Sequence, residues 1–256
     1  MIDEWEVTIP QLTGDKKRKA YVYLPEDYEY DEERRYPVLY MFDGHNLFYD
    51  YEATYGKSWG LKEYLDKTRT PLIIAAVECN HEGHSRLSEY SPVDFTFKDG
   101  TPIKGKGKKY MDWLVNTFKP YIDENLRTLS DRAHTAIAGS SMGGLMTIYA
   151  LAKYNKYFSR GAALSPSLWV ENGSVPAFVR TGKFGKDTVL YTDYGSLEFK
   201  NHDTQKAAFR DTVACLTDKG VNITSRIIYG GTHSEASWEK QIPFFMRALG
   251  FEENNI

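Results

Sequence analysis

The hydrophobic residues of this chain recur in short runs that predict β-strands. Residues 5–9 and 18–24 alternate apolar and polar side chains with turn residues between them, so we expect an antiparallel hairpin at the start. The runs at 37–42 and 71–77 are continuously apolar, as in strands buried on both faces of a sheet. Later runs of strand length lie at 135–138, 161–165, 188–193 and 225–229.

Segments with helical spacing separate most of these strands. We expect helices around 59–65, from 111 to about 126, after 139–143, at 206–216 and at 239–249. Strands that alternate with helices predict a mostly parallel sheet with right-handed crossovers and helices on both faces. We therefore expect one α/β domain over residues 1–256, with no second domain.

Two connecting segments have lengths that bear on function. The polar stretch 78–106 is long for a compact domain, and such loops are more often functional than accidental. By contrast, only about twenty residues separate Ser165 from Lys186, in line with short α/β connections. This length is too small for a cap domain, so we expect a site that is open from above.

Composition and charge argue against several kinds of partner. The net charge is −3, with acidic and basic residues interspersed, so no basic surface for nucleic acid is indicated. The N-terminus is polar and the longest apolar runs are strand-sized, so we expect neither a signal peptide nor a membrane span. The two cysteines, Cys79 and Cys215, are interpreted as ordinary buried thiols, which suits a reducing cytoplasm.

One short motif, G-S-S-M-G at 139–143, lies between a predicted strand and a predicted helix. A G-x-S-x-G sequence in this setting forms a sharp turn that exposes the serine hydroxyl above the sheet. Ser141 is therefore the candidate nucleophile, whereas Ser140 occupies the variable position and should point away from the cleft. Glycine is needed at 139 and 143, because a Cβ atom would collide where the strand packs on the helix.

A serine hydroxyl is a weak nucleophile, and it needs a histidine base and an acid that orients the imidazole. In α/β-hydrolases the chain order is serine, acid, histidine. His233 follows the last predicted strand, at the sheet edge where catalytic groups of open α/β sheets collect. Glu198 leaves the strand at 188–193 and is the candidate acid, with Asp193 as the alternative.

With these motifs the chain resembles the esterase family of α/β-hydrolases that includes esterase D, siderophore esterases, feruloyl and acetyl-xylan esterases, and mycolyltransferases. The resemblance covers nearly the whole chain, through L-Y-M-F-D-G at 39–44, R-L-S-E-Y-S-P at 86–92, G-S-S-M-G-G at 139–144 and G-T-H at 231–233. It implies an α/β-hydrolase fold and serine esterase activity. It also places the acid in a Gly-x-x-acid segment, here 195–198, although many members carry aspartate there.

The resemblance further implies an oxyanion hole, the pair of N–H donors that binds the developing negative charge in acyl transfer. Removing one such donor typically costs roughly 100- to 1,000-fold in rate. One donor is expected to be the backbone N–H of Met142, the residue after the nucleophile. The other is expected to be the backbone N–H of His45, which follows the D-G pair, so that the imidazole of His45 is not the base.

Aromatic residues gather in segments expected at the carboxyl edge of the sheet. Trp169, Trp238 and Phe199 are the candidate substrate-binding residues, with further rings at Phe48, Tyr49 and Tyr51. Flat rings around a shallow cleft suit a sugar face or an aryl acid and leave no tunnel for a long acyl chain. We therefore expect a short-chain or aromatic ester, carried by a small molecule or an oligosaccharide.

Other functions remain open on the sequence alone. The same triad serves an acyltransferase, a siderophore esterase or an S-formylglutathione-type thioesterase. A non-catalytic binding module on a hydrolase scaffold is disfavoured, because decay normally removes one of the three triad residues.

One cysteine and two histidines have a spacing that suggests zinc. Cys79, His81 and His84 lie close in sequence, with Glu82 between them. Structural zinc sites usually need four ligands, and no second pair follows elsewhere in the chain. We therefore expect no metal and no cofactor.

Overall fold

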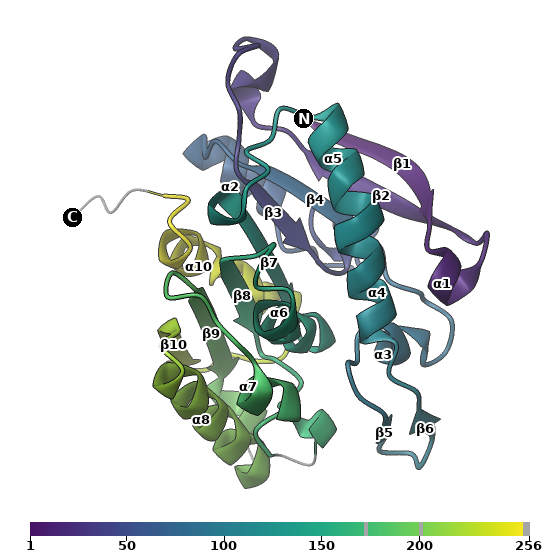
Figure 1. Ribbon diagram of the computed structural model, residues 1–256, viewed down its shortest axis with the longest axis vertical. Helices are drawn as coiled ribbons and strands as arrows, with labels where there is room; N and C mark the ends of the chain where they lie inside the picture. The colour runs from purple at the N-terminus through teal and green to yellow at the C-terminus, as the bar shows by residue number, and fades with distance from the viewer. Residues whose placement is uncertain (172–173, 200–201, 253–256) are drawn as a thin grey trace.

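The computed structural model describes residues 1–171, 174–199 and 202–252, which form a central sheet with helices on both faces (Figure 1). Within these residues the main sheet has eight strands, in the order β1-β2-β4-β3-β7-β8-β9-β10. β1 and β2 form the predicted antiparallel hairpin, and β2 pairs antiparallel with β4. The remaining pairs of this sheet, from β4 and β3 to β9 and β10, are all parallel. The strands are β1 (Ile2–Thr8), β2 (Lys17–Tyr23), β3 (Val38–Met41), β4 (Ile73–Val77), β7 (Thr135–Ser140), β8 (Arg160–Leu164), β9 (Val189–Gly195) and β10 (Asn222–Ile228).

Helices cover the sheet in two layers. α2 (Leu61–Thr68) and α10 (Ile242–Ala248) pack on one face, through side chains of one core cluster. A second core cluster joins the opposite face to α4 (Gly107–Trp113), α5 (Lys119–Asn125), α6 (Met142–Lys153), α7 (Ala177–Thr181) and α8 (Asp203–Asp218). The helix predicted from 111 to about 126 is a continuous rod of α4, the π-helical turn η3 (Leu114–Phe118) and α5 (Figure 1). The remaining helices are α1 (Pro10–Thr13), α3 (Ser85–Glu89), α9 (Glu235–Glu239), η1 (Glu26–Glu29), η2 (Gly44–Asn46), η4 (Arg132–His134), η5 (Leu168–Glu171) and η6 (Ser196–Phe199).

Strand β3 illustrates why an unbroken apolar run forms a central strand. Successive side chains of a strand point to opposite faces. Val38 and Tyr40 accordingly enter the core on one side of the sheet, whereas Leu39 and Met41 enter the core on the other. All four residues are buried, which confirms the sequence-based prediction.

The segment 78–106, expected to be a loop, contains more structure than its sequence indicated. It holds α3 and a small hairpin of β5 (Phe95–Thr96) and β6 (Pro102–Ile103). Elements of two to five residues are too short to leave a periodic pattern, which is why the sequence did not predict them. The hairpin lies near the carboxyl edge of the main sheet, because the ring of Phe95 lies 5.5 Å from the ring of Trp169 in η5, which follows β8.

In the part of the chain that the structure describes, no helix is both long and apolar enough to span a membrane.

Candidate active site

Ser141 occupies the sharp turn between β7 and α6. Its backbone has φ 58° and ψ −120°, a conformation that L-residues rarely adopt and that stores strain. The turn depends on glycine, because a Cβ atom at Gly139 would lie 2.9 Å from the backbone of Gly143. Ser140 is buried and Ser141 is partly exposed, so the two serines face different surroundings, as the motif predicts.

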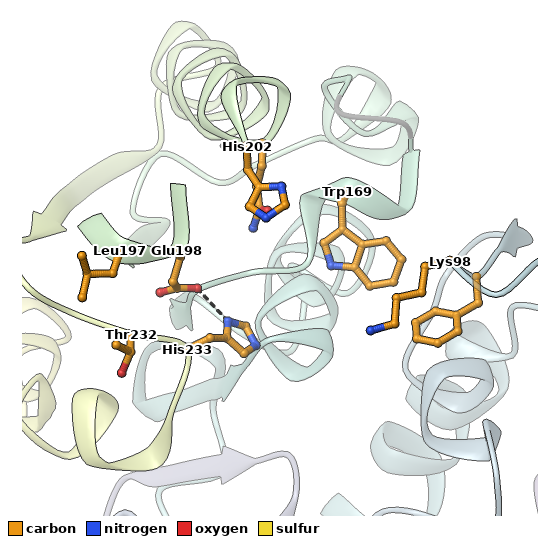
Figure 2. Close-up of a pocket in the computed structure, with 9 residues that line it drawn as sticks. Lys98, Trp169, Leu197, Glu198, His202, Thr232 and His233 are labelled. Carbon is orange, nitrogen blue, oxygen red and sulfur yellow. Dashed lines mark hydrogen bonds and ion pairs between the residues drawn. The ribbon is translucent and has the colours of Figure 1, made fainter. Parts of the chain in front are cut away.

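The structure brings together the three residues that the sequence singled out as a triad. Ser141 Oγ lies 2.9 Å from His233 Nε2, and His233 Nδ1 lies 2.6 Å from Glu198 Oε2. Figure 2 shows the contact between Glu198 and His233 at the edge of a cavity. The three side chains come from segments that follow β7, β9 and β10, which are parallel strands ending at one edge of the sheet.

The second carboxylate oxygen of Glu198 is held by two donors. Ser165 Oγ and the backbone N–H of Gly195 each donate to Oε1 at 2.7 Å. Ser165 Oγ in turn accepts the indole N–H of Trp238 at 3.0 Å. These bonds fix Glu198 while its other oxygen faces His233.

Asp193, the alternative acid, lies elsewhere. It is buried within β9, and Tyr191 donates its hydroxyl to Oδ2 at 2.8 Å. Burial raises the pKa of Asp193 to about 7. Of the two carboxylates considered, the structure therefore places Glu198 beside the imidazole and Asp193 in the core.

The loop after β3 is anchored by a bidentate ion pair. Arg86 donates from Nε and Nη2 to the two carboxylate oxygens of Asp43, both at 2.7 Å. The backbone N–H of Asp43 donates to the hydroxyl of Tyr90 at 3.3 Å. The D-G and R-L-S-E-Y-S-P motifs are thus in direct contact, because Arg86 and Tyr90 of the second motif bind Asp43 of the first.

The two residues expected to donate to the oxyanion both lie at the start of a helix. His45 is the second residue of the 3₁₀ helix η2, and Met142 is the first residue of α6. The first N–H groups of a helix have no acceptor within that helix. Gly44 allows the loop after β3 to pack closely on Tyr21, since a Cβ atom at position 44 would lie 2.7 Å from the ring of Tyr21.

A family model described as "Putative esterase" matches residues 12–248. The chain belongs to this esterase family. Over 176 residues it is 28% identical to YbbA of Bacillus subtilis (strain 168), a match that covers 68% of this esterase and 66% of YbbA. It is 22% identical over 250 residues to an endo-1,4-beta-xylanase/feruloyl esterase of Xylanibacter ruminicola, covering 95% of this chain and 31% of that protein. The esterase thus spans less than two thirds of either relative.

Solved structures share its fold. A ferulic acid esterase superposes with a TM-score of 0.68 at 20% identity, over 98% of each chain. An IroE-like serine hydrolase of Shewanella oneidensis superposes with a TM-score of 0.71 at 21% identity, over 97% of this chain and 78% of that one. The expected α/β-hydrolase fold is confirmed.

Two cavities meet at His233. The larger, about 660 Å³, has Glu198 and His233 on one side and Lys98 and Trp169 on the other (Figure 2), and Phe97 also lines it. The smaller, about 200 Å³, is lined by Ser141 and His233 together with Asn46, Arg86, Glu235 and others. His233 therefore lies between the two cavities, whereas Ser141 lines the small polar cavity and not the larger one with aromatic walls.

The expected aromatic residues have different fates. Trp169 lines the larger cavity, as a substrate-binding residue would. Trp238 is 5% exposed and lines the smaller cavity, and its ring contacts the ring of His233 edge-on at 5.1 Å. The side chain of Phe199 lies outside the described residues.

The aromatic residues after the D-G pair were wrongly placed by the sequence argument. Phe48 is 2% exposed and packs in the core, while Tyr49 and Tyr51 stack on each other 5.2 Å apart and line neither cavity. The sequence argument also missed Phe97 and Lys98 in the β5–β6 hairpin. Its one signal for them was the length of the segment 78–106, because no motif marks these residues.

Proposed function

We propose that this protein is a serine carboxylesterase that hydrolyses a short-chain or aromatic acyl ester, most readily an ester on a carbohydrate. The observation that carries the proposal is the unbroken chain of contacts from Ser141 through His233 to Glu198, at 2.9 Å and 2.6 Å. A strained turn that exposes the serine and an acid held by two further donors support it.

In the proposed mechanism His233 donates its Nδ1–H to Glu198, which leaves Nε2 free to accept a proton. Ser141 Oγ attacks the ester carbonyl and transfers its proton to Nε2. The backbone N–H groups of Met142 and His45 donate to the oxyanion. When the bond to the alcohol breaks, Nε2 returns the proton to the leaving oxygen. Water then repeats these steps on the acyl-enzyme, which releases the acid and frees the serine.

The two cavities support a division of the substrate. The smaller cavity is lined by the proposed nucleophile Ser141 and by Asn46, which follows the proposed oxyanion donor His45, so it should receive the acyl group. At about 200 Å³ it is smaller than the roughly 300–1,000 Å³ of typical ligand pockets, which favours a short acyl chain. The larger cavity offers the ring of Trp169 for stacking on the sugar face of the alcohol.

A second candidate is an ester with an anionic or phenolic aryl group, as in a catecholate siderophore. Lys98 and His202 both line the larger cavity, where they could pair with such a group. The ring of Phe97, beside Lys98, provides an apolar face for an aryl group.

The first experiment tests the nucleophile. Ser141→Ala should abolish hydrolysis of p-nitrophenyl acetate, whereas the matched Ser140→Ala variant should stay active. A fluorophosphonate probe should label the wild-type protein at Ser141 alone. Labelling at Ser140, or full activity of the Ser141 variant, would refute the proposed triad.

The second experiment tests the substrate. Activity on p-nitrophenyl esters should fall from acetate to decanoate, and a rise along this series would rule out a short acyl chain. Acetylated xylan, a feruloyl ester, S-formylglutathione and a catecholate siderophore then separate the candidate classes. Product analysis with and without an acceptor alcohol separates hydrolysis from acyl transfer.

A further inference from the structure

Three side chains with metal-ligating atoms meet behind the loop that follows β3. They are His45 in η2, Cys79 just after β4, and His81 two residues further on, and their ligand atoms all lie within 4.8 Å of one another. Cys79 Sγ lies 4.0 Å from His81 Nδ1. His45 is 4% exposed and Cys79 is 3% exposed, so two of the three side chains are buried.

Each imidazole is already engaged through its other nitrogen. His45 Nε2 lies 3.0 Å from Thr54 Oγ1, and His81 Nε2 lies 3.5 Å from a carboxylate oxygen of Glu78. Hydroxyl and carboxylate partners of this kind orient the histidine ligands of metal sites. The nitrogen that remains on each ring is Nδ1.

His45 Nδ1 has no hydrogen-bond partner among the residues that the structure describes, although it is buried. A polar atom without a partner in the interior is costly, and native structures usually satisfy such atoms with protein, water or an ion. The buried Nδ1 atom is thus an observation, independent of the cysteine, that indicates a ligand.

We propose that His45, Cys79 and His81 form a binding site for Zn²⁺. A thiolate with two imidazoles is a donor set that zinc prefers, with a fourth position left for water. Tetrahedral zinc holds sulfur and nitrogen ligands roughly 3.6 Å apart. The 4.0 Å between Cys79 and His81 must therefore shorten by a few tenths of an ångström. The His81 side chain is 52% exposed, which gives the ion a path and the ligand room to move.

Binding is an exchange of a proton for the ion. Burial, followed by the neighbouring Asp43 carboxylate, raises the pKa of the Cys79 thiol, so the sulfur carries its proton before the ion arrives. On binding, the S–H bond breaks, the sulfur–zinc bond forms, and the proton leaves to solvent. No atom is oxidised or reduced.

The zinc spacing noted in the sequence pointed to a different third ligand. His84 turns away, because its Nε2 lies 3.3 Å from Asp99 and its ring packs 5.0 Å from the ring of Phe97. His45 takes that place from a segment more than thirty residues upstream. The expectation of no metal rests on the lack of a second ligand pair in the sequence, and sequence spacing contains no information on the approach of His45.

The site adjoins the loop of the proposed oxyanion hole, since His45 also offers the backbone N–H. Drawing its imidazole towards an ion should displace that donor, and a shift of about 1 Å can cost roughly 100-fold in rate. We therefore expect Zn²⁺ to lower kcat at least about tenfold. This coupling rests on the proposed function, whereas the binding does not.

The test measures binding apart from catalysis. Tag-free Ser141→Ala protein is titrated with Zn²⁺ against a chromophoric chelator, and with Co²⁺ to detect thiolate-to-metal absorption. We expect about one ion per chain. Cys79→Ser and His81→Gln in the same background should each weaken Zn²⁺ binding at least about 100-fold, because loss of an outer partner alone can cost roughly 10- to 100-fold. Cys215→Ser and His84→Gln are the matched controls and should bind as the parent does.

Two binding results would overturn the site: no Zn²⁺ bound by the parent, or equal binding by the Cys79→Ser and Cys215→Ser variants. The thiolate absorption with Co²⁺ must also disappear in the Cys79→Ser variant, whose folding is checked by its thermal melt. In the active protein, inhibition by Zn²⁺ should vanish with Cys79→Ser. If Zn²⁺ inhibits the wild-type protein and its Cys79→Ser variant equally, the proposed effect of zinc on catalysis is wrong, and the binding result still stands.

Discussion

Replacing Arg86 with methionine should lower both the melting temperature and the turnover of the esterase, because it leaves the Asp43 carboxylate buried without its cation. Both oxygens of Asp43 accept bonds from Arg86 at 2.7 Å. The Asp43 side chain is 6% exposed and that of Arg86 is 28% exposed. Water can therefore replace the guanidinium only in part.

The size of the loss follows from this burial. Removing one partner of a buried ion pair costs roughly 3–5 kcal/mol, and the partial exposure of Arg86 points to the lower end, about 3 kcal/mol. In a domain of about 250 residues each kcal/mol lowers Tm by roughly 2–4 °C, so the expected drop is roughly 6–12 °C. Since Asp43 begins the loop with the proposed oxyanion donor His45, kcat should fall by up to about 100-fold.

The pair also predicts a pH dependence. Burial alone would raise the pKa of Asp43, but the charge and hydrogen bonds of Arg86 prevail and hold it below its usual value. A carboxyl with a lowered pKa stabilises the fold above the unfolded value of about 3.9, and this stability is lost as pH falls through the folded value. In Arg86→Met burial acts without the guanidinium, so Asp43 takes up its proton at a higher pH, and the difference in Tm between wild type and variant should shrink as pH falls towards 4 and below.

Thermal melts followed by circular dichroism, with kinetics on p-nitrophenyl acetate, provide the measurement. Arg210→Met is the matched control, because Arg210 and Asp211 form an exposed pair with side chains 75% and 49% exposed. The double variant Asp43→Asn/Arg86→Met should melt above Arg86→Met, since it removes the unpaired charge. The reasoning fails if Arg86→Met melts no lower than Arg210→Met, or if the double variant is the least stable.

Glu198→Gln should cut kcat steeply on p-nitrophenyl acetate, whereas Asp193→Asn should change it little, because Glu198 alone of the two lies 2.6 Å from His233. Ser165→Ala removes a donor to that carboxylate and should lower kcat roughly tenfold with KM unchanged. Gly195→Ala places a Cβ atom 2.3 Å from the backbone of Gly231, two residues before His233, so both Tm and kcat should fall. Burial raises the pKa of Asp193 to about 7, so the stability that this carboxyl contributes is lost as pH rises from about 4 to 7. Asp193→Asn should therefore make Tm less dependent on pH over that range.

The sheet was predictable because the pattern of apolar residues in its central strands indicates how they are buried. The run at 37–42 is apolar at every position, and the structure buries all of β3 between two layers of core. The edge strand β10 contains no buried residue, and its exposure does not alternate regularly along the strand. The short elements α3, β5 and β6 depend on tertiary contacts, and no window of sequence encoded them.

The meeting of Ser141, His233 and Glu198 was predictable from a motif and a chain order, but the groups that hold these side chains were not. Ser165 is a strand-end serine without a motif, and its contact with Glu198 spans 33 residues of sequence. Phe48 was expected near the substrate because it follows the D-G pair, yet the turn of η2 sends it into the core beside Tyr21. Side-chain direction after a tight turn depends on backbone geometry, and composition says little about it.

Buried polar contacts explain how side chains on loops can hold a geometry fine enough for the proposed catalysis. A buried carboxylate is tolerated only when it is bonded, so Glu198 with its two donors and Asp43 with Arg86 each have one favourable position. The first position aims the histidine, and the second fixes the loop of His45. Because these contacts hold the proposed reacting groups and do not involve Phe97 or Trp169 on the aromatic side of the larger cavity, removing them should lower kcat far more than it raises KM.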